Sequence, residues 1–281
     1  MTNPEPKRGF DELEYKMRAQ SLQIAMSEKE IEGLLLWSEA EFRYFTGFDT
    51  PFWQSPTRPW FLFIPLVGAP IAIIPEIGQA AMRNTWITDI RSWTAPNPAD
   101  DGVSLLMELL HPLAVKQACL GVLKGHETTL RMPLGDWERL QKGLLGIKIK
   151  DATNLLQAAR MIKSEAEIEK LNHICQIASG TFGVLPKVVS QKMSMQEIFR
   201  LFKLMALQHG ADDVPYVVGN AGQGGYRDII SLPSKHSLRA GDVLMLDSGC
   251  VWDGYFCDFN RNWAIGKADE QSRRVYDVLW R

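Results

Sequence analysis

The chain has 281 residues, with 31 Lys and Arg against 33 Asp and Glu and a formal net charge of −2. At roughly 100–200 residues per domain, this length predicts two domains. The near-balance of charge argues against a nucleic acid or a membrane surface as the main partner, because both favour a basic patch. The most apolar stretch, residues 60–75, is broken by prolines and a glycine and is too short to span a membrane.

The cysteines and the N-terminal residues bear on the cellular compartment. The cysteines show no CxxC spacing and no His pair at zinc-finger distance, which favours free thiols over disulfides or a zinc site. They are Cys119, Cys175, Cys250 and Cys257. The polar N-terminal stretch, residues 1–8, lacks the apolar segment of a signal peptide. The sequence therefore predicts a cytoplasmic protein.

Helical and strand-like patterns alternate over the first half of the chain. Helices are predicted over residues 11–32, 41–45, 76–84, 102–113 and 134–144. Short apolar runs predict strands over residues 33–37, 61–65, 71–74, 87–93 and 118–123. The runs at 61–65 and 71–74 flank a Val-Gly-Ala turn and are expected to form a hairpin. This alternation predicts an α/β domain over residues 1–155.

Residues 156–281 are the second predicted domain, which starts with two helices. The first helix is expected over residues 158–189, and the second ends at Gln208. Each contains a capping box, in which a Ser and a Glu three residues later satisfy each other's free backbone N–H. The two pairs are Ser164 with Glu167 and Ser194 with Glu197.

Strand signals dominate the rest of the second domain. A strand over residues 215–218 leads into a glycine-rich loop, residues 219–225. That loop does not open a helix and lacks the Lys-Ser/Thr of a phosphate-binding loop, which disfavours a nucleotide site. Strands over residues 243–249 and 255–263 then precede a helix that starts at residue 269.

Two aspartates lie in the last two predicted strands. Asp253-Gly254 between them suits a hairpin turn, because Gly accepts a positive φ without steric cost. Asp247 and Asp258 are eleven residues apart, so with an even loop both side chains point to the same face of the hairpin. A four-residue loop over residues 251–254 would place them opposite each other, and a two-residue loop would make them diagonal neighbours.

Two carboxylates on one half-buried face repel each other, so a shared proton, an arginine or a bound cation is expected to compensate. Oxygen ligands at this spacing suit hard divalent ions, which makes Asp247 and Asp258 candidate metal ligands. The alternative is that both aspartates face solvent and Asp258 is paired with Arg261. The pattern alone leaves both interpretations open.

Three segments together resemble a known family. Asp247-x-Gly249 with Asp258 and Arg261 resembles the metal-binding hairpin of the creatinase, Xaa-Pro aminopeptidase and prolidase metallohydrolases, family M24. Residues 160–168, Arg-x-x-Lys-Ser-x-x-Glu-Ile, resemble the opening of that family's catalytic domain, and residues 44–48 resemble a segment of its N-terminal domain. The segments occur in the expected order along essentially the whole chain.

The resemblance implies a creatinase-type α/β N-terminal domain followed by an α+β pita-bread catalytic domain, of which only about half is present. It implies a homodimeric metal-dependent hydrolase that cleaves an amide bond with metal-activated water. Family members use two divalent metal ions (manganese, cobalt, iron or zinc), held by two Asp, one His and two Glu. Asp247 matches the first aspartate and Asp258 the bridging one. Arg261 matches an Arg that orients the second aspartate or has a structural role.

The sequence departs from the family pattern in two ways. The segments that supply the His and Glu ligands would lie beyond residue 281, so a C-terminally incomplete member is expected, and no catalytic residue is assigned. Ile230 aligns with a substrate-contacting His, which leaves an X-Pro peptide or a small non-peptide amide as substrate. The alternatives are a non-catalytic binding module and an inactive truncated member. Unpaired sheet edges of such a fragment would favour pairing with another chain.

Overall fold

The computed structural model describes residues 4–55 and 58–281, so the first three residues of the polar N-terminal stretch lie outside it. The described chain forms two compact units. One is Gly9–Ile162, and the other combines residues 4–8 with Lys163–Arg281. The boundary predicted after residue 155 falls inside α6 (Thr153–Met161), whereas the compact units divide after Ile162.

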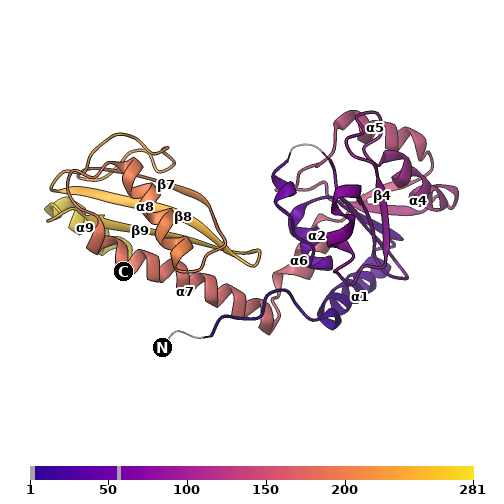
Figure 1. The fold of residues 1–281 in the computed structure, drawn as a ribbon, viewed down its shortest axis with the longest axis horizontal. Helices are drawn as coiled ribbons and strands as arrows, with labels where there is room; N and C mark the ends of the chain where they lie inside the picture. The colour runs from indigo at the N-terminus through magenta and orange to yellow at the C-terminus, as the bar shows by residue number, and fades with distance from the viewer. Residues whose placement is uncertain (1–3, 56–57) are drawn as a thin grey trace. The chain divides into compact units, whose positions relative to one another are not determined.

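The first unit contains, within the described residues, a six-stranded mixed sheet in the order β4-β3-β2-β1-β5-β6 (Figure 1). Its strands are β1 (Gly33–Leu36), β2 (Phe61–Pro65), β3 (Ile71–Pro75), β4 (Asp89–Trp93), β5 (Cys119–Val122) and β6 (Lys148–Asp151). Its α-helices are α1 (Glu12–Glu28), α2 (Glu39–Thr46), α3 (Gln79–Met82), α4 (Val103–Val115), α5 (Leu134–Gly143) and α6. Two 3₁₀ helices are η1 (Pro51–Gln54) and η2 (Glu76–Gly78).

Alternate residues of the central strand β1 enter different cores. Leu34 and Leu36 pack in one apolar cluster and Leu35 in another, and all three are fully buried. Because a strand buried on both faces has apolar residues at every position, the unbroken apolar run of the sequence predicts β1. The expected hairpin is confirmed, because β2 and β3 pair antiparallel. Strand β6 was missed because its sequence, Lys-Ile-Lys-Asp, is mostly polar and exposed at the sheet edge.

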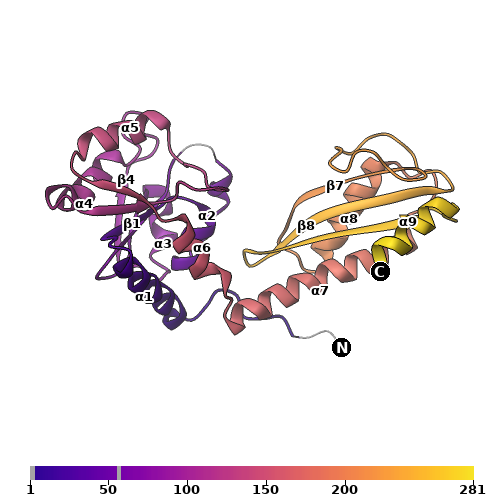
Figure 2. The same ribbon diagram turned by 180° about the vertical axis from the view of Figure 1, so that it is seen from behind.

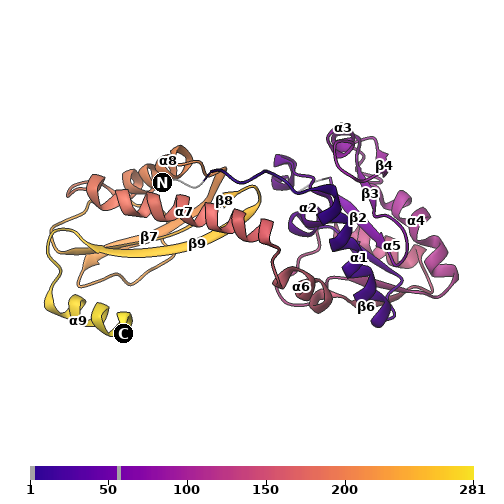
Figure 3. The ribbon, with the colours of Figure 1, turned by 90° about the horizontal axis from the view of Figure 1, so that it is seen from below.

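The second unit is built on an antiparallel sheet of three strands within its described residues, in the order β7-β8-β9. Its elements are α7 (Glu165–Val188), α8 (Met195–Gln208), β7 (Asp213–Gln223), β8 (Asp242–Trp252), β9 (Tyr255–Ala264) and α9 (Glu270–Trp280). Figures 2 and 3 show α7 and α8 lying on the same face of this sheet. The core of the unit lies between those helices and the sheet and includes Phe182, Phe202 and Leu246.

Two corrections to the expected helices and strands have local causes. The helix expected from residue 158 is two helices, because Ser164 is extended and caps the start of α7. Both predicted capping boxes are present. Strand β7 continues to Gln223 rather than ending at Val218. Gly219 makes this possible, because a Cβ there would collide with the carbonyl oxygen of Met245 on β8.

Two further expectations concern membrane and redox chemistry. Among the described residues, no helix combines the length and the apolar character that crossing a membrane requires. All four cysteines are free thiols. Cys250 and Cys257 are buried and are direct partners across β8 and β9.

Candidate metal site

The turn between β8 and β9 sets the relative position of the two aspartates. Trp252 pairs with Tyr255, so the loop is the two-residue turn Asp253-Gly254. Its residues have φ values of 47° and 75°, which is typical of the tight hairpin turn that Asp-Gly favours. Of the two loop lengths that the sequence left open, the structure therefore has the shorter one.

A buried ion pair fixes this turn. The Lys170 ammonium lies 2.6 Å from the Asp253 carboxylate, and the two side chains are only 1% and 11% exposed. Lys170 also donates to the backbone carbonyl of Lys7, and the backbone N–H of Asp253 donates to Asp212 at 2.7 Å. Because a shift of one residue would turn every β9 side chain to the opposite face, this anchoring also determines which face carries the acids.

The short turn makes the two carboxylates diagonal neighbours on one face. Asp247 pairs with Asn260, and Asp258 pairs with Gly249. This face is the one turned away from the core, because the alternate residues Leu246 and Cys250 of β8 pack in the cluster beneath α7 and α8. Asp258 is exposed and Asp247 is half-buried.

A tyrosine joins the two carboxylates. The Tyr216 hydroxyl on β7 lies 3.1 Å from Asp247 Oδ1 and 2.8 Å from Asp258 Oδ1, so its one proton serves both acceptors. Gly249, the direct partner of Tyr216, provides the space. A Cβ at Gly249 would lie 2.6 Å from the Tyr216 ring and would also collide with Phe256. Because Gly249 has no side chain, the Tyr216 ring can approach β8 closely, and its hydroxyl reaches both carboxylates.

The pKa values of this trio reflect their crowding. Partial burial raises the pKa of Asp247 above 3.8; the Tyr216 hydrogen bond lowers it, and the charge of Asp258 raises it again. Burial and the two carboxylates raise the pKa of the Tyr216 hydroxyl. The phenol therefore stays protonated near neutral pH and acts as a donor. The carboxylates retain a mutual repulsion that a cation would relieve.

Arg261 does not neutralise this pair. Among the described residues, no ion pair joins it to Asp258, so the alternative of an Asp258–Arg261 pair is wrong. Arg261 is the third residue after Asp258 along β9, and this odd offset directs the two side chains to opposite faces. The guanidinium donates to the carbonyl of Asn260 and lies 5.1 Å from the centre of the Phe259 ring. These contacts give Arg261 a structural role on the helix-covered face.

In the part of the chain that the structure describes, no third acidic, histidine or cysteine side chain joins the two aspartates. Within the described residues, no group of three such side chains is placed to hold a metal ion. His236 lies 3.6 Å from Asp242, which is buried and belongs to the other face of β8. Ile230, the position expected to match the family's substrate-contacting His, is 75% exposed in the loop between β7 and β8.

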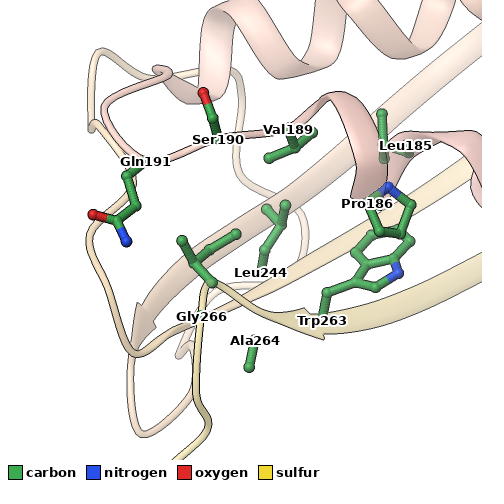
Figure 4. Close-up of a pocket in the computed structure, with 10 residues that line it drawn as sticks. Leu185, Pro186, Val189, Ser190, Gln191, Leu244, Trp263, Ala264 and Gly266 are labelled. Carbon is green, nitrogen blue, oxygen red and sulfur yellow. The ribbon is translucent and has the colours of Figure 1, made fainter.

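A cavity of about 350 Å³ lies at the far end of the same sheet (Figure 4). Its lining includes Leu185 and Pro186 from the end of α7, with Leu244 and Trp263 from β8 and β9. Leu244 and Trp263 are strand partners three residues from Asp247 and Asn260, so they face the helices. The lining contains no titratable side chain. The cavity is therefore separate from the carboxylate pair and offers no metal ligands of comparable chemistry.

The fold class is that of a creatinase-type domain followed by a pita-bread domain, as solved structures show. The dipeptidase PepE from Mycobacterium ulcerans superposes with a TM-score of 0.78 at 22% identity, covering 97% of this chain and 70% of that one. The prolidase from Thermococcus sibiricus superposes with a TM-score of 0.78 at 21% identity, with the same coverage.

Family models match both halves of the sequence. The creatinase/prolidase N-terminal domain matches residues 18–162, and metallopeptidase family M24 matches residues 169–281. The chain belongs to metallopeptidase family M24, with a creatinase/prolidase N-terminal domain. It is similar to the probable dipeptidase PepE of Mycobacterium tuberculosis, with 24% identity over 98% of this chain and 70% of that protein. The Xaa-Pro dipeptidase of Pyrococcus horikoshii is 23% identical over 53% of this chain and 42% of that protein.

Tyr216 is the residue that the sequence did not reveal. It is a single tyrosine in a predicted strand, and no spacing links it to Asp247 thirty-one residues later. Its relation to the acids depends on the register between β7 and β8, which includes an irregularity between Asp213 and Tyr216. A sequence pattern of alternating residues does not locate such a bulge.

Proposed function

We propose that this chain is a metal-dependent peptidase that hydrolyses the amide bond of X-Pro peptides, with Asp247 and Asp258 as metal ligands. The observation that carries the proposal is the pairing of two carboxylates on the open face of the β8–β9 hairpin, bridged by the Tyr216 hydroxyl. Relatives named dipeptidase and Xaa-Pro dipeptidase support peptide substrates. Membership of a metallopeptidase family supports the metal.

The donor chemistry of the site fits a divalent cation. Both aspartates offer oxygen ligands, and they lie as diagonal neighbours on one face, where a cation would offset the repulsion between their charges. Bound divalent ions at such a site lower the pKa of water and polarise the amide carbonyl. We propose two ions per complete site, with manganese, cobalt, iron and zinc as candidates, because carboxylate-rich sites discriminate weakly among them.

The chain's own residues prepare this site. Tyr216 holds the two carboxylates at a common point, which reduces their freedom before an ion arrives. The Lys170–Asp253 pair keeps the hairpin in the register that turns both acids outward. Ile230 is exposed, and if it matches the family's substrate-contacting His, as expected from the sequence, it would offer the substrate an apolar contact there.

Homodimer formation is proposed on the family relationship. A cytoplasmic location is proposed from the polar N-terminal stretch and the cysteine pattern, and the four free thiols are compatible with it. A small non-peptide amide is the second candidate substrate. The observation that favours it is that residue 230, where the family is expected to have a His, is an isoleucine. The non-catalytic alternative is not favoured, because the named relatives are peptidases.

Metal binding and hydrolysis test the proposal separately. The protein is stripped of metal, titrated with Mn²⁺ and assayed on dipeptides with and without a C-terminal proline. Asp247→Asn and Asp258→Asn should each abolish Mn²⁺ binding. Asp277→Asn, which changes an exposed acid on α9, should not. Unchanged Mn²⁺ binding by Asp258→Asn would contradict the site, and hydrolysis of other amides but not X-Pro dipeptides would contradict the substrate class.

A further inference from the structure

We infer that Asn260 supplies a third oxygen ligand to the metal site, through its carboxamide oxygen. This inference rests on the proposed role of Asp247 and Asp258. Asn260 is the direct cross-strand partner of Asp247, and it follows Asp258 by two residues on β9. It is therefore adjacent to both carboxylates on the same face of the sheet.

The register makes this adjacency close. The Cβ atoms of directly opposed residues in an antiparallel pair lie about 4.5–5.5 Å apart. Residues two positions apart along one strand lie about 7 Å apart on the same face. Asn260 thus faces Asp247 across the strands and stands beside Asp258 along β9. Together with the diagonal Asp247–Asp258 relation, this gives a triangle of three oxygen-bearing side chains.

The chemistry of a carboxamide suits this position. Amide oxygens coordinate hard divalent cations alongside carboxylates. A neutral ligand adds an oxygen without adding a third negative charge to a face that already holds the two carboxylates. A third aspartate at this position would increase the repulsion in the metal-free protein.

The neighbouring Asn262 provides the contrast that isolates this role. It lies on the same face but pairs with Met245, and its carboxamide oxygen accepts a 2.7 Å hydrogen bond from Tyr226. Asn260 is also exposed, and among the described residues no hydrogen bond is found for its carboxamide; its backbone carbonyl accepts one from Arg261. The two asparagines therefore share residue type, strand and face and differ in their distance from the acids.

Mn²⁺ affinity, measured from the relaxation of water protons, distinguishes the role of Asn260 from that of Asn262. Asn260→Ala should weaken Mn²⁺ binding by about tenfold or more, the order of loss seen when support for a metal ligand set is removed. Asn262→Ala should stay within about twofold of the unaltered protein. Asn260→Asp should tighten binding more than Asn262→Asp, because only the first places the new carboxylate beside both acids.

The outcomes separate this inference from the proposed function. If Asp258→Asn abolishes binding and Asn260→Ala leaves it within about twofold, the metal site stands and Asn260 is not a ligand. Equal effects of Asn260→Asp and Asn262→Asp would overturn the inference as well, because charge alone would explain them. If the unaltered protein fails to bind Mn²⁺, both the site and the inference fail. Circular dichroism of each variant shows that an altered affinity does not come from unfolding.

Discussion

The two faces of the β7-β8-β9 sheet differ in chemistry although the same strands form both. Leu246 and Trp252 of β8 are fully buried against α7 and α8, whereas Asp258, Asn260 and Asn262 of β9 are exposed on the other face. Alternation along a strand gives both faces from one sequence. The helices decide which face becomes core and which remains available for chemistry. The proposed site is thus the part of the sheet that α7 and α8 leave uncovered.

Each face also carries one pair of potentially reactive groups. Cys250 and Cys257 face each other beneath the helices, while the Asp247–Asp258 pair lies on the open face. A hydrogen bond from Cys257 lowers the pKa of Cys250 to about 7, and the same contact raises the pKa of Cys257. Burial leaves these thiols as core residues. Exposure leaves the acids within reach of ions and substrate.

Breaking the turn that sets both faces should have the largest effect. Lys170→Met removes the ammonium from a largely buried ion pair with Asp253, and breaking a buried ion pair costs about 3–5 kcal/mol. Urea denaturation should show this loss. The exposed pair of Arg274 with Glu270 serves as control, since both side chains are at least 75% exposed and Arg274→Met should cost well under about 1 kcal/mol. Similar losses in the two variants would show that the turn is not held by Lys170.

Matched substitutions on the two faces measure their difference directly. Leu246→Ala removes a fully buried side chain and should cost about 2–5 kcal/mol in the free energy of unfolding. Asn262→Ala on the exposed face should cost about 0.5 kcal/mol. Denaturation curves of the two variants check this contrast. If Asn262→Ala lowered the free energy of unfolding as much as Leu246→Ala does, the open face would also be packed in the folded protein.

Gly249→Ala tests the close approach of Tyr216 to the strand. The added methyl group would collide with the rings of Tyr216 and Phe256, and such overpacking costs about 1–3 kcal/mol. We expect lower stability together with weaker Mn²⁺ binding, because the displaced tyrosine no longer aligns the acids. Gly135→Ala is the control, since a Cβ there meets no atom within 4 Å. Full retention of Mn²⁺ affinity in Gly249→Ala would contradict the aligning role of Tyr216.

The smallest expected effect is on pH dependence. The pKa of Asp247 is raised in the folded protein, so its contribution to stability is present below pH 3.8 and is lost as pH rises through the folded pKa. Tyr216→Phe removes the hydrogen bond that lowers this pKa, so the loss should extend to higher pH. Carboxyl carbon NMR should show a higher Asp247 pKa in Tyr216→Phe and no change in Tyr276→Phe. A lower pKa in Tyr216→Phe would reverse the assigned role of the hydroxyl.

Much of this protein follows from the sequence because local rules determine it. The capping boxes at Ser164 and Ser194 mark the start of α7 and α8, since their hydrogen bonds span three residues. The apolar run of β1 predicts a strand buried on both faces. Asp253-Gly254 predicts a turn, and odd spacing places Asp247 and Asp258 on a common face. Each of these inferences involves residues close together in the chain.

The tertiary structure decided what depends on distant residues. The two-residue length of the turn is held by Lys170, more than eighty residues before Asp253. The meeting of Tyr216 with both acids requires an irregular β7–β8 register, and the room for it comes from Gly249. The exposure of the acids depends on α7 and α8 packing against the opposite face. The sequence alone determined that the two carboxylates share a face. Long-range packing determined which face it is, because the two faces of a strand are equivalent until α7 and α8 cover one of them.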